Sequence, residues 1–159
     1  MSKTTFITEG QKGLLKQALE LTGSDGFMED AVAIAACPTG TGAMHGIAVF
    51  ECFRGGRAEM HLGYAEGRRL SRDMITALAF IAFHPGYFGL KQLLARVPVR
   101  NTGAICMLIR AGFEIEYRDR GSVRGGEDGI VLSLSCDDIL ASAGPSDSDF
   151  RSRMTGQQE

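Results

Sequence analysis

The stretch "GLKQLLARVPVRNTGAICMLIRAGFEIEYR", residues 89–118, contains three successive secondary-structure signals. Its apolar first part, 90–99, predicts a β-strand, and its last part, 113–120, predicts another. Between them lies a short segment with the features of a capped helix. The stretch therefore predicts a strand–helix–strand unit.

Residues at both ends of the middle segment mark the limits of that helix. Asn101 suits an N-cap, because its side-chain oxygen can accept a hydrogen bond from an N–H group of the first turn. Gly112 fits the left-handed position after the last turn, with Phe113 as the apolar contact that follows. We therefore predict a helix over about 102–111.

A second strand–loop–helix unit precedes this stretch. Residues 57–65, "RAEMHLGYA", predict a strand, and a helix is expected over about 71–84 with Ser71 as N-cap. Side chains of a strand alternate between its faces. The alternation places Ala58, Met60, Leu62 and Tyr64 on one face and Glu59, His61 and Gly63 on the other.

The remaining elements complete a mixed sheet. A helix is predicted at 10–22 and strands at 31–37, 47–53 and 129–135, with a hairpin turn at 54–56. The predicted order is one helix, three strands in a meander, a helix, a strand, a helix and two strands. Strands on both sides of two crossover helices indicate one mixed sheet, of α/β class with α+β character.

Length and composition define the class of protein. A chain of 159 residues fits one domain, for which we take residues 1–140. Residues 141–159 are small and polar and are predicted to be a disordered tail. The net charge of −2, and the absence of aromatics interleaved with basic residues, disfavour nucleic acid as a partner.

The sequence lacks the patterns that mark secreted, membrane-spanning and metal-binding proteins. The N-terminus lacks a hydrophobic signal segment, and no apolar run approaches the roughly 20 residues of a membrane-spanning helix. The four cysteines form no CxxC pair, so buried, reduced thiols are expected. The three histidines are scattered, which disfavours a metal site. These features predict a cytoplasmic protein without a membrane partner.

The loop "GYAEGRRLSRDM", residues 63–74, has the composition of an anion site. It places Arg68, Arg69 and Arg72 around Gly67 and Ser71, between a strand and the start of a helix. Unpaired N–H groups and the positive end of the helix dipole favour phosphate there, and arginines add charge-assisted donors. Solvated surface charge is the alternative interpretation of the arginines.

The order of elements, and the stretch 89–118 in particular, resemble the GNAT acetyltransferase family. The matching signature is an asparagine after a strand, a nearby alanine, a short helix and a Gly-Phe pair that opens a strand; here these are Asn101, Ala104, Gly112 and Phe113. "AEMHLGYA", 58–65, resembles the preceding strand of that family, notably in the branch that acetylates N-terminal amines of ribosomal proteins.

The resemblance implies a fold, a cosubstrate and a cofactor-binding site. The implied fold is a single mixed β-sheet flanked by helices, splayed between the parallel strands 58–65 and 90–97. Acetyl-CoA would lie in that splay, and its pyrophosphate would lie on the loop after the first strand. The implied cofactor-binding residues are Tyr64, Ala65, Gly67, Arg68, Arg69, Leu70, Ser71, Arg72 and Asn101, with backbone N–H groups near Tyr64 and Ala65 holding the oxyanion.

The reaction implied is direct transfer of an acetyl group to a primary amine, on a small molecule or a protein N-terminus. Glu59 lies on the polar face of the strand whose end should face the acetyl group, and it is the candidate base. His61 lies on the same face and could share that task. The alternative to catalysis is a cross-strand ion pair for Glu59 and a half-buried structural position for His61. The oligomeric state is left open between monomer and homodimer.

Two positions depart from the family pattern. The usual phosphate loop has two small residues, but only Gly67 matches, and Arg69 stands where the second should be. The tyrosine acid of many members corresponds to Leu108. A second hypothesis therefore stays open: a catalytically degenerate GNAT-fold protein that acts through protein contacts, for example as a phage or virion-associated component.

Overall fold

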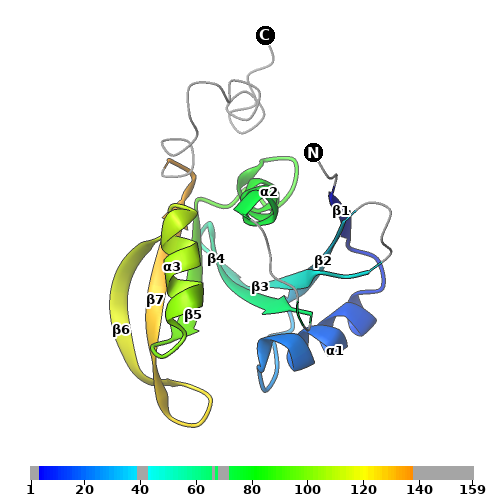
Figure 1. Ribbon diagram of the computed structural model, residues 1–159. Helices are drawn as coiled ribbons and strands as arrows, with labels where there is room; N and C mark the ends of the chain where they lie inside the picture. The colour runs from blue at the N-terminus through cyan, green and yellow to red at the C-terminus, as the bar shows by residue number, and fades with distance from the viewer. Residues whose placement is uncertain (1–3, 39–42, 66, 68–71, 138–159) are drawn as a thin grey trace.

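The computed structural model describes residues 4–38, 43–65, 67 and 72–137 (Figure 1). In these ranges it shows a seven-stranded mixed sheet with the strand order β1-β2-β3-β4-β5-β7-β6. The elements are β1 (Thr4–Ile7), α1 (Gln11–Thr22), β2 (Val32–Pro38), β3 (Gly46–Arg54), β4 (Arg57–Tyr64), α2 (Arg72–Phe83), β5 (Gln92–Pro98), α3 (Thr102–Arg110), β6 (Glu114–Val123) and β7 (Glu127–Ser135). The predicted α/β mixed class is confirmed.

The strand β1 is an addition to the predicted order, which wrongly began with a helix. It has four residues and pairs antiparallel with β2 from Thr4↔Pro38 to Ile7↔Ala35. A segment this short carries too little periodicity for recognition. It becomes a strand because β2 presents an unpaired edge to it.

The strands β4 and β5 are parallel neighbours that separate, as predicted. Their pairing runs only from Arg57↔Gln92 to Glu59↔Leu94. Beyond Glu59, β4 stays paired with β3, whereas β5 stays paired with β7 along its whole length. The sheet therefore divides into two halves that diverge at the C-terminal ends of β4 and β5 (Figure 1).

The helix α3 has both predicted caps. The Asn101 side chain accepts a hydrogen bond from the Ala104 N–H at 3.2 Å. At the other end the Phe113 N–H donates to the Leu108 carbonyl, and the Gly112 N–H donates to the Ile109 carbonyl, each at 3.0 Å. This is the Schellman pattern, in which glycine tolerates the positive φ of 106°.

A β-bulge in β3 fixes which side chains face which side of the sheet. The register with β4 shifts between Glu51 and Arg54, and Cys52 has a φ of 56°. The Asp30 carboxylate supports the bulge by accepting from the Cys52 N–H at 3.0 Å and the Phe53 N–H at 2.8 Å. Bulges are common next to active sites, where they redirect side chains.

Helices cover both faces of the sheet. On one face, α1 packs over a small core of Ala18, Ala33, Ala35, Ile47 and Val49. On the other, α2 and α3 pack over the main core, whose largest fully buried members include Phe50, Leu78, Leu93, Leu108 and Leu132. The predicted alternation of β4 holds: Ala58 and Met60 join the main core, and Gly63 faces Leu21 of α1.

Gly63 allows α1 to approach β4 closely. A Cβ atom at Gly63 would lie 2.7 Å from the Leu21 Cβ and 2.8 Å from its backbone carbonyl carbon. We expect Gly63→Ala to lower the free energy of unfolding by about 1–3 kcal/mol, because the helix must shift. Gly13→Ala is the matched control, since a Cβ there meets nothing within 4 Å. Urea denaturation that ranks the two variants equally stable would contradict the prediction.

The expectations for the cysteines, the C-terminal tail and membrane-spanning segments have different outcomes. All four cysteines are free thiols, but Cys52 and Cys106 are exposed, so the expectation of burial was wrong for them. The tail, 141–159, lies outside the described residues, so its disorder stays a prediction. None of the helices in the described ranges combines the length and apolar character that membrane spanning requires.

Candidate active site

The gap between β4 and β5 contains a pocket of about 180 Å³. Its lining comes from both faces of the sheet, with Tyr64, Ala104 and Met107 on the α3 side and His61 and Arg96 on the α1 side. A pocket of this kind forms because the two strands diverge, so no main-chain ladder closes the sheet.

On the α3 side the pocket wall is held by polar contacts. The Tyr64 hydroxyl donates to the Met107 sulfur at 3.4 Å, which links β4 to α3 across the gap. Tyr64 and Asn101 both line the pocket, and their predicted role in cofactor binding stays a prediction. The Asn101 Oδ1 is already engaged as the helix cap, so its amide NH₂ is the part available to a ligand.

The backbone of β4 presents donors to the gap. The Ala65 N–H donates to the His45 carbonyl at 3.0 Å, toward β3. Because N–H groups alternate along an antiparallel strand, those of His61 and Gly63 also point toward β3. Those of Leu62 and Tyr64 point the other way, into the space that β5 leaves. The Ala65 N–H is therefore used inside the sheet, and the predicted oxyanion role of the backbone near Tyr64 and Ala65 stays a prediction.

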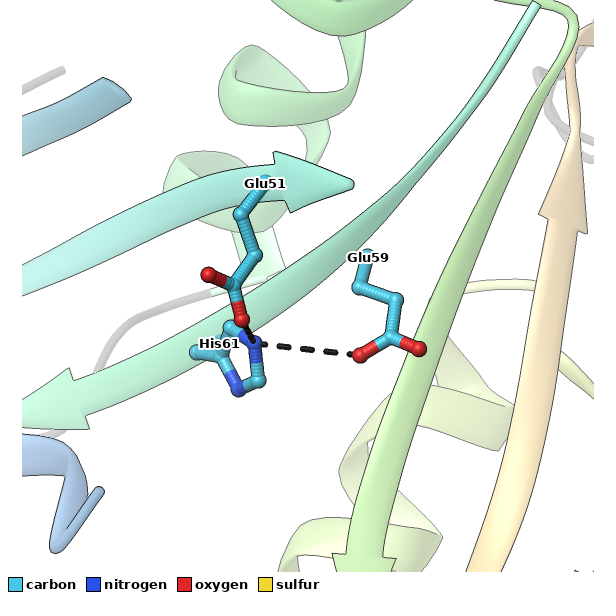
Figure 2. Close-up of side chains that lie close together, drawn as sticks. All are labelled: Glu51, Glu59 and His61. Atoms are coloured by element: carbon cyan, nitrogen blue, oxygen red, sulfur yellow. Dashed lines mark hydrogen bonds and ion pairs between the residues drawn. The ribbon is translucent and has the colours of Figure 1, made fainter. Parts of the chain in front are cut away.

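On the α1 side, His61 lies between two carboxylates (Figure 2). Its Nε2 is 2.8 Å from Oε1 of Glu51 and 3.9 Å from Oε2 of Glu59. The first distance is a hydrogen bond, and the second is too long for one. The predicted catalytic residues Glu59 and His61 are thus brought together, and Glu51 joins them from β3.

Arg96 of β5 completes this group. Its Nη1 atom lies 3.5 Å from the Glu59 carboxylate, and its Nε atom lies 3.3 Å from the carboxylate of Asp119 in β6. The ion pair considered as the alternative role of Glu59 is therefore present. It does not exclude a catalytic role, since the same carboxylate also faces His61. His61 and Arg96 line the pocket, and the three carboxylates that contact them lie behind this lining and give the group a net negative charge.

Glu51 is the site residue that sequence reasoning missed. Glu51 is 7% exposed, and its Oε2 accepts a hydrogen bond from the Met28 N–H at 2.6 Å. A charged side chain is seldom buried without partners. The signal in the sequence was a single glutamate inside the otherwise apolar strand "IAVFECF", 47–53.

The loop expected to hold phosphate is only partly described. Gly67 is exposed with a φ of 69°, a conformation that favours glycine. Arg68, Arg69, Leu70 and Ser71 lie outside the described residues, and α2 begins at Arg72. Pyrophosphate binding by this loop therefore stays a prediction.

The side chains of Glu51, Glu59 and His61 are also of types that bind metal ions. The ligand atoms of Glu51, Glu59 and His61 lie within 4.8 Å of one another. The atoms that would bind an ion are the ones already used in the His61–Glu51 hydrogen bond and the Glu59–Arg96 ion pair. A metal ion bound there would have to displace both contacts.

Cys52 is the nearest thiol in sequence to the group. Although Cys52 is exposed, partial desolvation by its neighbours raises the pKa of this thiol, and the charges of Glu51, Glu59 and Asp30 raise that pKa further. A raised pKa keeps a thiol protonated at neutral pH, and the thiolate is the nucleophilic form. The direction of this pKa shift gives no support to a covalent step through Cys52.

Three solved N-acetyltransferase structures share this architecture. The spermidine/spermine N-acetyltransferase SpeG from Vibrio cholerae, in complex with manganese ions, superposes with a TM-score of 0.73 at 14% identity, covering 89% of this chain and 98% of that one. The complex of the Vibrio cholerae spermidine N-acetyltransferase with CoA and spermine gives 0.69 at 13% identity, covering 86% and 98%. A mutant of SpeG from the same organism gives 0.71 at 15%, covering 86% and 96%.

The fold is therefore that of the GNAT superfamily, as the sequence resemblance implied. No sequence family model matches the chain, and no curated protein matches it. Identities of 13–15% show the fold alone.

Proposed function

We propose that this protein transfers an acetyl group from acetyl-CoA to a primary amine by direct attack. The observation that supports the proposal most strongly is the pocket at the β4–β5 splay, with an apolar wall on one face of the sheet and a charged histidine–carboxylate group on the other. Acetyl-CoA enters from the α3 side and the amine from the α1 side. No covalent enzyme intermediate is required.

On the α3 side, the protein positions the thioester. The N–H groups of Leu62 and Tyr64 are aimed at the gap and hold the carbonyl oxygen as it gains negative charge. Asn101 and Met107 line the channel beside it. Fixed donors of this kind act without reorganising during the reaction, which is the source of their effect on rate.

On the α1 side, the protein attracts and deprotonates the amine. Alkylamines such as the lysine side chain have pKa values near 10, so at neutral pH the acceptor arrives as an ammonium ion. The negatively charged group around Glu59 and His61 favours this cation. One member of that pair then takes a proton, because only the neutral amine has a lone pair for attack.

The acceptor class is an amine-bearing small molecule or a protein N-terminus. The negative charge around Glu59 and Asp119 suits either. One structural neighbour has spermine bound, so polyamines are the first acceptors to assay. A panel of spermidine, spermine and short peptides, assayed by release of the CoA thiol and by mass spectrometry of the product, tests the activity directly.

The competing function is a GNAT-fold protein that has lost acetyl-CoA binding and acts through protein contacts. Arg69 at the place of a small residue in the phosphate loop favours it. Thermal stability separates the two hypotheses, because acetyl-CoA at a hundred times its dissociation constant should stabilise the fold by about 2.7 kcal/mol. No shift at millimolar acetyl-CoA would support the second function.

The arginines of the loop should contribute strongly to that binding. We expect simultaneous replacement of Arg68, Arg69 and Arg72 by Ala to weaken acetyl-CoA binding, each charge-assisted contact being worth on the order of 1.5–3 kcal/mol without simple additivity. Isothermal titration of both proteins measures the change. Equal affinities would place the phosphates elsewhere.

A further inference from the structure

We propose that Glu51 is a positioning residue that fixes the proton of His61 on Nε2 and so makes His61 Nδ1 the acceptor of the amine proton. This inference rests on the proposed acetyl transfer, whose base was left open between Glu59 and His61. It assigns different roles to the two residues. It is based on the contacts of Glu51, which the sequence did not single out.

Glu51 is held in one orientation by two separate donors. Its Oε2 accepts from the Met28 N–H at 2.6 Å, and its Oε1 lies 2.8 Å from His61 Nε2. The side chain is nearly buried, so these contacts are not exchanged with bulk water. An ionised carboxylate only accepts hydrogen bonds, and therefore the nitrogen facing it must carry a proton.

The tautomer of His61 follows from this contact. With the proton on Nε2, a neutral imidazole has its lone pair on Nδ1. Figure 2 shows Nδ1 on the side of the ring away from the Glu51 contact. Within the described ranges Nδ1 has no hydrogen-bond partner, and His61 lines the pocket at the splay. The ring of Phe27, 5.6 Å away between centroids, packs against the imidazole.

Glu59 has a different set of contacts. Its Oε2 pairs with the Arg96 guanidinium at 3.5 Å and lies 3.9 Å from His61 Nε2, beyond hydrogen-bond range. It does not determine the histidine tautomer. Its carboxylate lies behind the pocket-lining His61 and Arg96, and from there its charge attracts the ammonium group of the acceptor.

The resulting step is balanced in protons and electrons. The ammonium group first loses one proton through His61 Nδ1 to water, which leaves a neutral amine and a neutral imidazole. The amine nitrogen then forms a bond to the acetyl carbonyl carbon, the C–S bond breaks, and its electron pair leaves with the CoA sulfur. The proton lost by nitrogen passes to His61 Nδ1, and the imidazolium formed is stabilised by Glu51. That proton then passes to the departing sulfur, which gives the amide and the free CoA thiol.

The variant Glu51→Gln tests the inference because glutamine cannot reproduce both contacts. Its single oxygen must serve the Met28 N–H, which leaves the NH₂ group facing His61 Nε2. That nitrogen then has to accept, so the proton moves to Nδ1 and removes the lone pair needed for catalysis. In ¹⁵N-labelled protein, with the three histidines assigned through a His61→Asn variant, we expect the Nε2–H tautomer in wild type and the Nδ1–H tautomer in Glu51→Gln.

Kinetics should follow the tautomer. We expect Glu51→Gln to lower kcat by about 100-fold or more, the usual contribution of a general base, while the dissociation constant for acetyl-CoA stays unchanged. Glu59→Gln is the matched comparison. It should leave the tautomer unchanged and raise KM for the amine more than it lowers kcat.

The outcomes separate this inference from the proposed function. An active wild type whose Glu51→Gln variant keeps the Nε2–H tautomer, or keeps full kcat, overturns the positioning role and leaves acetyl transfer standing. A wild type that binds no acetyl-CoA and acetylates no amine overturns the proposed function and with it the catalytic role of His61. A tautomer change together with the loss of kcat supports the inference.

Discussion

Replacing Ala104 by Phe is expected to weaken acetyl-CoA binding by at least about 100-fold, or about 2.7 kcal/mol, while the protein stays folded. Ala104 of α3 lines the pocket at the splay. A pocket of about 180 Å³ has little room for both an aromatic ring and a ligand. The change fills space that the fold leaves empty, so the core is not expected to be disrupted.

The control for this variant is Cys106→Phe. Cys106 lies on the same helix but is exposed, so it receives the same side chain away from the pocket. Ala104→Phe loses some helix propensity that Cys106→Phe does not, because Ala is the best helix former and Cys and Phe rank alike. Isothermal titration should show wild-type affinity for Cys106→Phe and no measurable binding for Ala104→Phe. Wild-type affinity in both variants would place acetyl-CoA outside the splay.

Replacing Phe50 by Ala is expected to lower the free energy of unfolding by about 3–5 kcal/mol, the usual loss for a fully buried aromatic residue. Phe50 is 0% exposed, and its ring lies 5.3 Å from that of Phe88, in an edge-to-face arrangement. Its removal leaves a cavity between β3 and the segment that follows α2. Much of the stability of a domain of this size would be lost.

The matched control is Phe53→Ala. Phe53 lies on the same strand, and its ring also lies 5.3 Å from that of Phe88, because the bulge returns it to the same face. It is only partly buried, so its removal should cost clearly less than that of Phe50. Urea denaturation measures the free energy of unfolding of the two variants, which lose the same contact with Phe88 but differ in how deeply the removed ring was buried. Equal losses would mean that the ring pair, and not burial, stabilises this region.

Local chemistry was sufficient to predict the elements that carry their own signals. The caps of α3 are an example, since Asn101 and Gly112 act on backbone groups within a few residues of themselves. The alternation along β4 is another, because a strand has a period of two wherever it lies. The resemblance then supplied the parallel pairing of β4 with β5, which the register from Arg57 to Glu59 confirms.

The sequence by itself thus determined the class of fold, the helix limits and the facing of Glu59 and His61. Only the tertiary structure decided that β1 is a strand, since four residues need a partner edge, and that Glu51 meets His61 across two strands. That contact depends on the register of β3 against β4 and on which face Glu51 takes at the start of a bulge supported by Asp30. Long-range register follows from packing between segments distant in the chain, and no local pattern contains it.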